Sequence, residues 1–291
     1  MPSAWGGVVS VDELVRAATG RLRQAGVASP EVDAELLLAH VMGLDAPQLR
    51  RARVMREQVP PEAHGAFLDL VVRRADRVPL QHLTGTAWFA GLELLVGPGV
   101  FVPRPETETL VRLALAALEP RPSPSVVDLC TGSGAIALAL AHRRPDAHVG
   151  AVELSPDAHR YAQANLARTG LPVDLRLGPA QDSFEDRRGR VDVVVSNPPY
   201  IPPDAVPVDV EVRDHDPELA LYGGGADGLL LPGLLAARAM VLLRPGGVLL
   251  MEHADVQSSA VVALLTGAGW SDVTDHDDLT GRPRVVTATR R

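Results

Sequence analysis

Lysine is absent from the chain, and all 28 of its basic residues are arginines. This absence excludes two kinds of active site, because a Walker-type P-loop and a Schiff-base enzyme both depend on a lysine amine. Acidic residues outnumber the arginines, and the formal net charge is −8. The arginines form scattered pairs and no long basic run, so the overall charge opposes an encounter with a polyanion such as nucleic acid.

Cysteine is almost absent too. One cysteine, Cys130, excludes an internal disulfide framework and a zinc site built from several cysteines. No window approaches the ~20 uninterrupted apolar residues of a membrane span, and the N-terminal MPSAWGGVVSVDEL lacks the basic-then-apolar pattern of a signal peptide. With 46% hydrophobic residues over 291 positions, we expect a folded, soluble, cytoplasmic protein with enough core for two domains and no membrane partner.

Residues 1–80 have the pattern of a small helical domain. Ser10 to Glu13 form a capping-box sequence, a second helix opens at Ser29-Pro30, and a third follows Pro60-Pro61. In residues 81–108, glycines punctuate short apolar runs, which is typical of a hairpin or an irregular connector. Two aromatic residues in this connector, Trp88 and Phe89, either pack or bind a partner, and we expect packing.

From residue 109 to 291, strand and helix patterns alternate. The expected strands are 126–129, 148–154, 173–177, 191–196, 247–253 and 284–289, and the expected helices are 135–142, 156–169, 228–243 and 256–265. Such alternation predicts an α/β domain with a mostly parallel, doubly wound sheet. Ligands of such sheets bind at the carboxyl ends of the strands, so we expect the catalytic site there.

A glycine-rich turn follows the first of these strands, in VVDLCTGSGAIALALA at 126–141. The turn consists of Cys130, Thr131, Gly132, Ser133 and Gly134. Its glycines allow a tight turn and close approach of a ligand, and the following helix offers free N–H groups. Glu153 ends the next strand, about 20 residues on, where a carboxylate can accept two ribose hydroxyls. Together they predict a cofactor that contains a nucleoside.

Asp128 favours one cofactor over another. A dinucleotide would bring a pyrophosphate over this turn, and a carboxylate would repel it, whereas S-adenosyl-L-methionine brings an ammonium and a sulfonium. The acidic strand end therefore favours S-adenosyl-L-methionine over NAD. Asp128 can also simply bind backbone N–H groups of its own loop, and both roles are compatible.

The stretch VDVVVSNPPYIPP at 191–203 is a strand that ends in Asn197, Pro198, Pro199 and Tyr200. Prolines end strands and asparagine favours turns, so the pattern by itself fits a strand terminator as well as a binding site. Beside a methyl donor, the Asn197 side-chain oxygen and the Pro198 carbonyl can accept the two N–H bonds of a planar NH₂ group. Tyr200 can stack on that plane, which makes the loop a clamp for an amide or an aromatic amine.

Three other features have simpler interpretations. Cys130 has no histidine near it in sequence, so we expect a backbone role and not a nucleophile. The acidic run DHDD at 275–278 lacks a spaced second set of metal ligands and is expected to be a solvated loop. His253 follows a strand and either lines the site or packs.

Several motifs together resemble those of the release-factor glutamine methyltransferase family, also called the HemK family. They are FVPRPETE at 101–108, DLCTGSGA at 128–135, NPPY at 197–200, DPELALYGGGADGL at 216–229 and DLTGRPRVV at 278–286. The resemblance covers essentially the full chain. NPPY is shared with adenine amino-methyltransferases, so the PRPETE segment and the ALYGGGADGL segment at 220–229 make the resemblance specific.

The resemblance implies a class I S-adenosylmethionine-dependent methyltransferase fold, which is Rossmann-like, and N5-methylation of the glutamine in the Gly-Gly-Gln loop of class I peptide-chain release factors. It implies that Cys130–Gly134, Glu153 and the pair Asp182-Ser183 hold the cofactor, with Ser183 near the adenine. Asn197–Tyr200 would bind the glutamine, and the N-terminal domain would help to engage the release factor. The chain departs from the family at Cys130, usually glycine, at Ser183, often aromatic, and at Glu153, commonly aspartate.

Two other functions remain open at this point. An adenine-N6 methyltransferase acting on DNA or RNA would use the same NPPY loop, although the acidic charge argues against nucleic-acid binding. An NAD-dependent oxidoreductase would use the glycine turn, although Asp128 and the absence of an obvious hydride-transfer partner argue against it. We expect no metal and no direct contact with nucleic acid.

Overall fold

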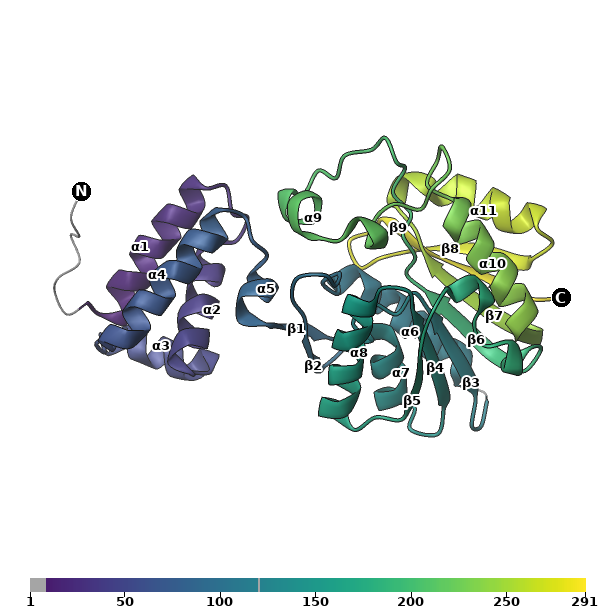
Figure 1. Ribbon diagram of the computed structural model, residues 1–291, viewed down its shortest axis with the longest axis horizontal. Coiled ribbons are helices and arrows are strands. Elements are labelled where there is room, and N and C mark those ends of the chain that lie inside the picture. The colour runs from purple at the N-terminus through teal and green to yellow at the C-terminus, as the bar shows by residue number, and fades with distance from the viewer. Residues whose placement is uncertain (1–8, 120) are drawn as a thin grey trace. The chain divides into compact units, whose positions relative to one another are not determined.

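The computed structural model describes residues 9–119 and 121–291. Most of the N-terminal stretch MPSAWGGVVSVDEL, which was expected not to be a signal peptide, lies outside the described residues. The chain divides into two compact units (Figure 1). One comprises the chain up to Gly85 together with Val208–His215, and the other comprises Thr86–Pro207 and Asp216–Arg291. We call them the helical unit and the sheet unit.

The helical unit is built from α1 (Val11–Gln24), α2 (Pro30–Met42), α3 (Ala46–Val54), α4 (Pro61–Ala75), α5 (Leu80–Thr84) and α9 (Val210–His215). The predicted capping box at Ser10 is confirmed: its hydroxyl accepts from the Glu13 N–H at 3.3 Å, and the Glu13 carboxylate accepts from the Ser10 N–H at 3.1 Å. The buried faces of the helices share one core around Leu14, Leu37 and Phe67.

Ion pairs hold α9 within the helical unit, although it lies more than 120 residues beyond α5 in sequence. Arg74 is buried and donates to Glu211 Oε1 at 2.8 Å and to Asp33 Oδ2 at 2.7 Å. Arg77 Nε donates to the same Glu211 oxygen at 2.8 Å. The chain therefore passes from the sheet unit into the helical unit between the NPPY loop and α9.

The sheet unit contains a seven-stranded sheet with the order β5-β4-β3-β6-β7-β9-β8. Strands β3 to β7 are parallel, and β9 is antiparallel to both β7 and β8. The strands are β3 (Ser125–Leu129), β4 (His148–Glu153), β5 (Val173–Leu177), β6 (Val191–Ser196), β7 (Leu243–Glu252), β8 (Ser271–Asp277) and β9 (Pro283–Thr289). All six strands predicted from the sequence are present.

Helices cover both faces of this sheet (Figure 1). They are α6 (Glu108–Leu118), α7 (Ala135–Arg143) and α8 (Pro156–Thr169) on one face, and α10 (Leu230–Leu242) and α11 (Ser258–Gly267) on the other. Successive strand residues alternate between the two cores: Val193 and Val195 belong to the first, and Val194 belongs to the second. The continuous valine run of β6 thus reflects a strand that is buried on both faces.

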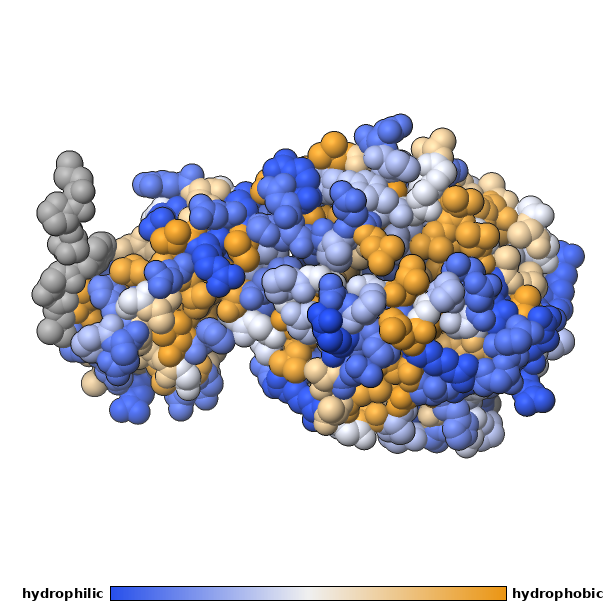
Figure 2. All heavy atoms as spheres, viewed as in Figure 1, coloured by the Kyte–Doolittle hydropathy of each residue, from blue (hydrophilic) through white to orange (hydrophobic). Residues whose placement is uncertain are grey.

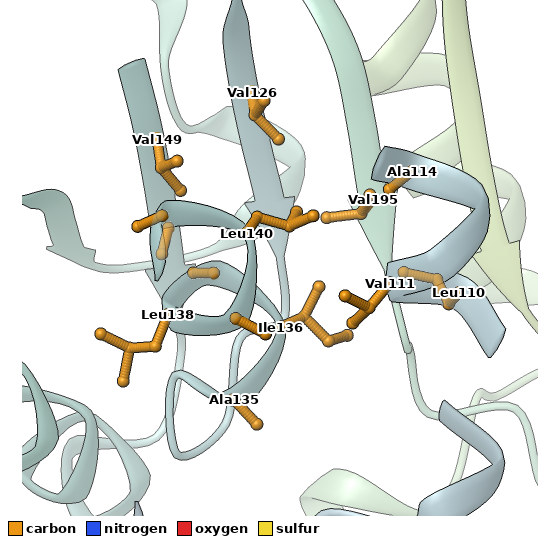
Figure 3. Close-up of a cluster of buried hydrophobic side chains, with 14 of the residues drawn as sticks. Leu110, Val111, Ala114, Val126, Ala135, Ile136, Leu138, Leu140, Val149 and Val195 are labelled. Atoms are coloured by element: carbon orange, nitrogen blue, oxygen red, sulfur yellow. The ribbon is translucent and has the colours of Figure 1, made fainter. Parts of the chain in front are cut away.

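Figure 3 shows the first core, where Ile136 and Leu140 of α7 point toward Val111 of α6 and Val195 of β6. These side chains are almost completely buried. Because α7 begins directly after the glycine turn, its apolar face fixes where that turn lies on the sheet.

A hairpin of β1 (Thr86–Phe89) and β2 (Leu92–Leu95) lies within the segment expected to be a hairpin or connector. Phe89 is buried, as expected, but Trp88 is 72% exposed, so the packing prediction was wrong for this residue. Buried Asn165 of α8 accepts from the Leu95 N–H at 2.6 Å and donates to the Ser133 carbonyl at 3.0 Å. It thereby connects the hairpin to the glycine turn.

The prediction of a solvated loop at 275–278 was wrong. Asp275–Asp277 belong to β8, which pairs with β9 at the edge of the sheet, and Asp278 is buried with Oδ1 accepting the Thr280 N–H at 2.7 Å. A strand at the edge of a sheet has one neighbouring strand and can carry polar residues along its whole length. Such a strand lacks the hydrophobic alternation from which strands are predicted.

Hydrophilic and hydrophobic side chains lie side by side on the visible face of each unit (Figure 2). Among the residues that the structure describes, no helix is both long enough and apolar enough to cross a lipid bilayer.

Candidate active site

The predicted site residues follow neighbouring parallel strands, and the ends of these strands are level. Leu129 of β3 pairs with Val152 of β4 and with Ser196 of β6, and Ser196 pairs with Met251 of β7. Because parallel strands all end at the same edge of a sheet, the loops after β3, β4, β6 and β7 meet there. The structure therefore brings the glycine turn, Glu153 and the NPPY loop to one edge.

The glycine turn has the backbone that its sequence predicts. Gly132 and Gly134 have φ of +59° and +85°, and Gly134 is the N-cap of α7. Cys130 has φ of +67°, in the left-handed region that favours glycine, which explains why glycine is usual at this position in the resembling family. A Cβ added at Gly132 would meet no atom within 4 Å, so this side of the turn is open to a ligand.

Asp128 is a buried carboxylate with one unused oxygen. Oδ2 accepts from the Thr131 hydroxyl at 2.6 Å, and Oδ1 has no hydrogen-bond partner among the described residues. Burial raises the pKa of Asp128 to about 7, and nearby Glu153 raises it further while the Thr131 hydroxyl opposes the shift. A cation beside Oδ1 would lower the pKa of Asp128 again, because a nearby positive charge favours the ionised carboxylate.

Glu153 binds the protein's own backbone on both carboxylate oxygens. Oε2 accepts from the Gly132 N–H at 2.7 Å and Oε1 accepts from the Ser155 N–H at 2.8 Å. Each oxygen keeps a further lone pair. Glu153 therefore fixes the glycine turn against β4 whether or not it also accepts ribose hydroxyls, and that second role stays a prediction.

Asp182 and Ser183 lie in the loop that follows β5. Asp182 is exposed, and the Ser183 hydroxyl donates to the Pro179 carbonyl at 2.8 Å. Arg238 of α10 donates to the Ser183 carbonyl at 2.8 Å. The next residue, Phe184, has φ of +62° and is buried, so its ring belongs to the core and does not replace the aromatic residue often found at position 183.

The NPPY loop is held from both sides. The Ser196 hydroxyl donates to the Leu129 carbonyl at 2.6 Å, and Asn197 Nδ2 donates to the Thr107 hydroxyl at 3.3 Å. Asn197 Oδ1 and the Pro198 carbonyl accept no hydrogen bond from the described residues. Both acceptors that the sequence assigned to a planar NH₂ group are thus available.

Unlike the Pro198 carbonyl, the Tyr200 carbonyl is occupied. The Tyr200 carbonyl accepts from Gln257 Nε2 at 2.8 Å. The same Gln257 nitrogen donates to the Asp227 carbonyl at 2.8 Å. Gln257 thereby joins the NPPY loop to the glycine-rich segment at 223–228, and the sequence analysis did not identify it.

Glycines at 223–228 pack directly on the backbone of the NPPY loop. A Cβ at Gly223 would lie 2.7 Å from the Pro199 carbonyl oxygen, and a Cβ at Gly228 would overlap the carbonyl oxygen of Tyr200. Ile201 N–H donates to the Leu221 carbonyl at 2.8 Å, and Gly223 N–H donates to the Ile201 carbonyl at 3.0 Å. The ALYGGGADGL segment at 220–229 therefore supports the NPPY loop.

The PRPETE segment contacts both other motifs. Thr107 accepts from Asn197, as described above, and Arg104 donates to Asp216 Oδ2 at 2.9 Å. Asp216 opens the DPELAL stretch. The PRPETE segment, the NPPY loop and the DPELALYGGGADGL segment therefore form one connected part of the site.

Glu252 is the functional candidate that sequence analysis missed. It ends β7, is 3% exposed, and its Oε1 lies 3.5 Å from the Tyr200 hydroxyl oxygen. Burial raises the pKa of Glu252 to about 7, against opposing effects of the Thr107 hydroxyl and the Arg284 guanidinium. The sequence signal that could have identified Glu252 is a carboxylate at the end of an apolar strand pattern, directly before His253.

Two of the simpler interpretations agree with the structure. Burial, Glu153 and Asp128 raise the pKa of the Cys130 thiol, so it stays protonated and is a poor nucleophile. His253 is buried and its Nε2 lies 3.0 Å from Asp275 Oδ1, so it packs. No cluster of three or more metal-binding side chains occurs within the described residues.

Known families match both parts of the chain. The description "PrmC N-terminal domain" matches residues 13–85, and "Methyltransferase small domain" matches residues 91–213. Among solved structures, a 16S rRNA methyltransferase of T. thermophilus in complex with AdoMet and guanosine is similar, with a TM-score of 0.51, 23% identity, and coverage of 71% of this chain and 50% of that one. At this identity the similarity concerns the fold, and it agrees with the predicted class I methyltransferase fold.

Curated relatives are similar over nearly their full length. The release factor glutamine methyltransferase of Mycolicibacterium smegmatis is 52% identical, over 95% of this chain and 96% of the relative. That of Streptomyces coelicolor is 50% identical over 95% and 96%. With its class I S-adenosylmethionine-dependent methyltransferase fold, this chain belongs to the family of release factor glutamine methyltransferases.

Proposed function

We propose that the protein transfers the methyl group of S-adenosyl-L-methionine to the side-chain nitrogen, N5, of the glutamine in the Gly-Gly-Gln loop of class I peptide-chain release factors. The observation that carries this proposal is the pair of free acceptors, Asn197 Oδ1 and the Pro198 carbonyl, in a chain half identical to relatives that bear this name. Release factors act in translation, so the reaction would take place in the cytoplasm.

The residues at the strand ends fit this cofactor. The unpartnered Oδ1 of buried Asp128 suits a cationic group, and the open side of Gly132 leaves room for a ligand against the turn. Cys130–Gly134, Glu153 and the loop with Asp182 and Ser183 would complete the binding site. When bound, the cofactor supplies a methyl group activated for nucleophilic attack by the positive charge on sulfur.

The NPPY loop would hold the glutamine amide in position. An amide nitrogen is a poor nucleophile because its lone pair is delocalised, so placement matters more than deprotonation. Asn197 Oδ1 and the Pro198 carbonyl would accept its two N–H bonds, and Tyr200 would stack on the amide plane. Pro198 and Pro199 are buried and stiffen the loop, which keeps both acceptors in place.

Proton loss needs no dedicated base. The new N–C bond forms as the C–S bond breaks, and the methylated nitrogen then carries an acidic N–H whose proton leaves during or after transfer.

The helical unit would engage the body of the release factor, as the family resemblance implies. Chain continuity supports a connection to the substrate loop, because the segment after NPPY leads into α9, and α9 is held in the helical unit by Glu211, Arg74 and Arg77.

One experiment tests the proposed function. The protein is incubated with radiolabelled S-adenosylmethionine and purified class I release factor, with a Gln→Ala variant of the Gly-Gly-Gln loop as control. We expect label in the wild-type factor and none in the variant. Label in DNA or RNA and none in the factor would instead favour the adenine-N6 methyltransferase, which shares the NPPY motif.

A further inference from the structure

Gln257 is a buried polar side chain that lies outside the motifs of the resemblance. It belongs to the short turn η5 (Asp255–Gln257), which follows β7, and it is 6% exposed. Its Nε2 donates to the Tyr200 and Asp227 carbonyls, each at 2.8 Å, and its Oε1 accepts from the Ala254 N–H at 3.1 Å. A buried amide is costly unless it is hydrogen-bonded, and here both N–H bonds and the oxygen are used.

The orientation of this amide is fixed by its partners. A glutamine side chain carries two N–H donors on its nitrogen and an acceptor on its oxygen. If the amide were reversed, its oxygen would face the Tyr200 and Asp227 carbonyl oxygens, and its NH₂ group would face the Ala254 N–H. All of these hydrogen bonds would be lost, so both donors stay directed at the two carbonyls.

The turn that carries Gln257 is anchored to two strands. The Gln257 backbone N–H donates to the Ala254 carbonyl at 2.8 Å, so these two residues are joined through the backbone as well as through the side chain. His253 Nδ1 lies 2.9 Å from the same carbonyl oxygen, and His253 Nε2 lies 3.0 Å from Asp275 Oδ1 on β8. The Gln257 side chain therefore reaches the NPPY loop from a support that is fixed to β7 and β8.

One peptide unit at the end of the NPPY loop is held at both of its polar groups. The Tyr200 carbonyl and the Ile201 N–H belong to the same planar peptide. Gln257 Nε2 donates to its oxygen at 2.8 Å, and its N–H donates to the Leu221 carbonyl at 2.8 Å. Two hydrogen bonds on one rigid plane fix its orientation, and with it the backbone from which the Tyr200 ring extends.

Gln257 also acts where the glycine-rich segment comes closest to this loop. Its second acceptor is the carbonyl of Asp227, the residue before Gly228, and a Cβ at Gly228 would overlap the Tyr200 carbonyl oxygen. At the other end of Tyr200, the hydroxyl oxygen lies 3.5 Å from Glu252 Oε1, at the limit of a hydrogen bond. The shorter bond from Gln257 is therefore the stronger of these two polar restraints on Tyr200.

We propose that Gln257 is a positioning residue for methyl transfer. Its amide holds the Tyr200 carbonyl against the segment of Asp227 and so sets the position from which the Tyr200 ring stacks on the substrate amide. Tyr200 touches the substrate, and Gln257 acts through it. The inference rests on the proposed function, and it requires an effect on the transfer step without an effect on cofactor binding.

Gln257→Glu provides the first test. The variant keeps the shape of the side chain but directs an oxygen at two carbonyl oxygens. For methylation of the release factor, we expect kcat to fall about 10- to 100-fold, while the Kd for S-adenosylmethionine, measured by calorimetry, stays within about twofold. Gln163→Glu makes the same chemical change at an exposed position of α8 and should leave both quantities unchanged. Wild-type kcat in Gln257→Glu would overturn the inference.

Gln257→Met provides a test that adds no charge. Methionine has a similar length and makes none of the three hydrogen bonds of the amide. It also covers the case in which Gln257→Glu does not fold, which circular dichroism would reveal. We expect kcat to fall about 10-fold with an unchanged Kd for S-adenosylmethionine. Wild-type kcat, or a loss of cofactor affinity as large as the loss of kcat, would contradict a positioning role.

A double-mutant cycle distinguishes positioning of Tyr200 from general support of the sheet unit. Tyr200→Ala removes the ring that Gln257 is proposed to position. In this background, we expect Gln257→Met to lower kcat by less than about threefold, compared with about 10-fold in the wild-type background. Losses that multiply would show that Gln257 does not act through the Tyr200 ring.

The two proposals fail in distinguishable ways. A wild-type protein that does not label the release factor would contradict the proposed function. A wild-type protein that labels it, together with unaffected Gln257→Glu and Gln257→Met variants, would contradict only the role of Gln257.

Discussion

Gly228 packs so closely on the carbonyl oxygen of Tyr200 that a Cβ at position 228 would overlap that oxygen. The two residues are 28 positions apart in the sequence, and the contact shows why the second motif is rich in glycine. Gly228 also has φ of +78°, in the left-handed region that residues with a Cβ rarely adopt.

We predict that Gly228→Ala displaces the NPPY loop and lowers kcat about 100-fold, because misplacement by about 1 Å has an effect of that order. Gly233→Ala is the matched control. Gly233 lies within α10, and its added Cβ would meet Leu264 at an ordinary 3.6 Å, so this variant should gain about 0.5–1 kcal/mol of stability and keep its activity. Steady-state kinetics and thermal unfolding check both outcomes.

Asn197→Ala should abolish methyl transfer while cofactor binding survives. The alanine removes an acceptor for the substrate amide, and we expect kcat to fall at least about 100-fold. The Kd for S-adenosylmethionine should change by less than about twofold, because the expected cofactor contacts come from the glycine turn, Asp128 and Glu153. Full activity in this variant would refute the NPPY assignment.

Asp128→Asn should weaken cofactor binding. The amide oxygen can still accept from Thr131, so the variant loses mainly the charge, and we expect Kd to rise about 10-fold. Affinity of the wild type should also rise as pH increases through about 7, where Asp128 ionises, and this dependence should disappear in the variant. Asp174→Asn, which removes the same charge from an exposed position on β5, is the control and should leave Kd unchanged.

Glu252 should make the protein less stable at high pH. Its pKa is raised from 4.5 to about 7 by burial, so its favourable contribution is complete below pH 4.5 and is lost as pH rises through about 7. The shift corresponds to about 3 kcal/mol, and Glu252→Gln should reduce the loss of stability between pH 5 and pH 8 by up to that amount. Tyr200, Arg284 and Glu106 also face this carboxyl group, so urea unfolding of the variant and the wild type must be compared at each pH.

Glu211→Ala should destabilise the helical unit by about 2 kcal/mol, because it deprives buried Arg74 of one of its carboxylate partners. Burial alone would raise the pKa of Glu211, but hydrogen bonds led by that from Arg77 lower it to about 2. Its contribution is therefore present above pH 4.5 and lost as pH falls toward 2. Asp214→Ala changes an exposed residue of the same helix and is the control. It should lower the free energy of unfolding by less than about 0.5 kcal/mol. Unfolding followed by circular dichroism measures both variants.

The sequence allowed much of the site to be predicted. Strand ends in a parallel sheet meet at one edge, so Asp128, Glu153 and Asn197 could be placed together from their positions after apolar runs. It did not reveal α9 as part of the helical unit, since six residues held by Glu211 have too short a pattern to assign. It also missed β8, whose edge position frees it from hydrophobic alternation.

By itself, the sequence determined the fold class, six of the strands of the sheet and the motifs, because hydrophobic periodicity and turn residues are local properties. Only the tertiary structure decided which motif supports which. Thr107 and Asn197 are 90 positions apart, and Tyr200 and Glu252 are 52 apart, so these contacts depend on how β6, β7 and the start of α6 pack. The direction of a buried hydrogen bond is set by the groups that surround it in space, and no spacing along the chain encodes it.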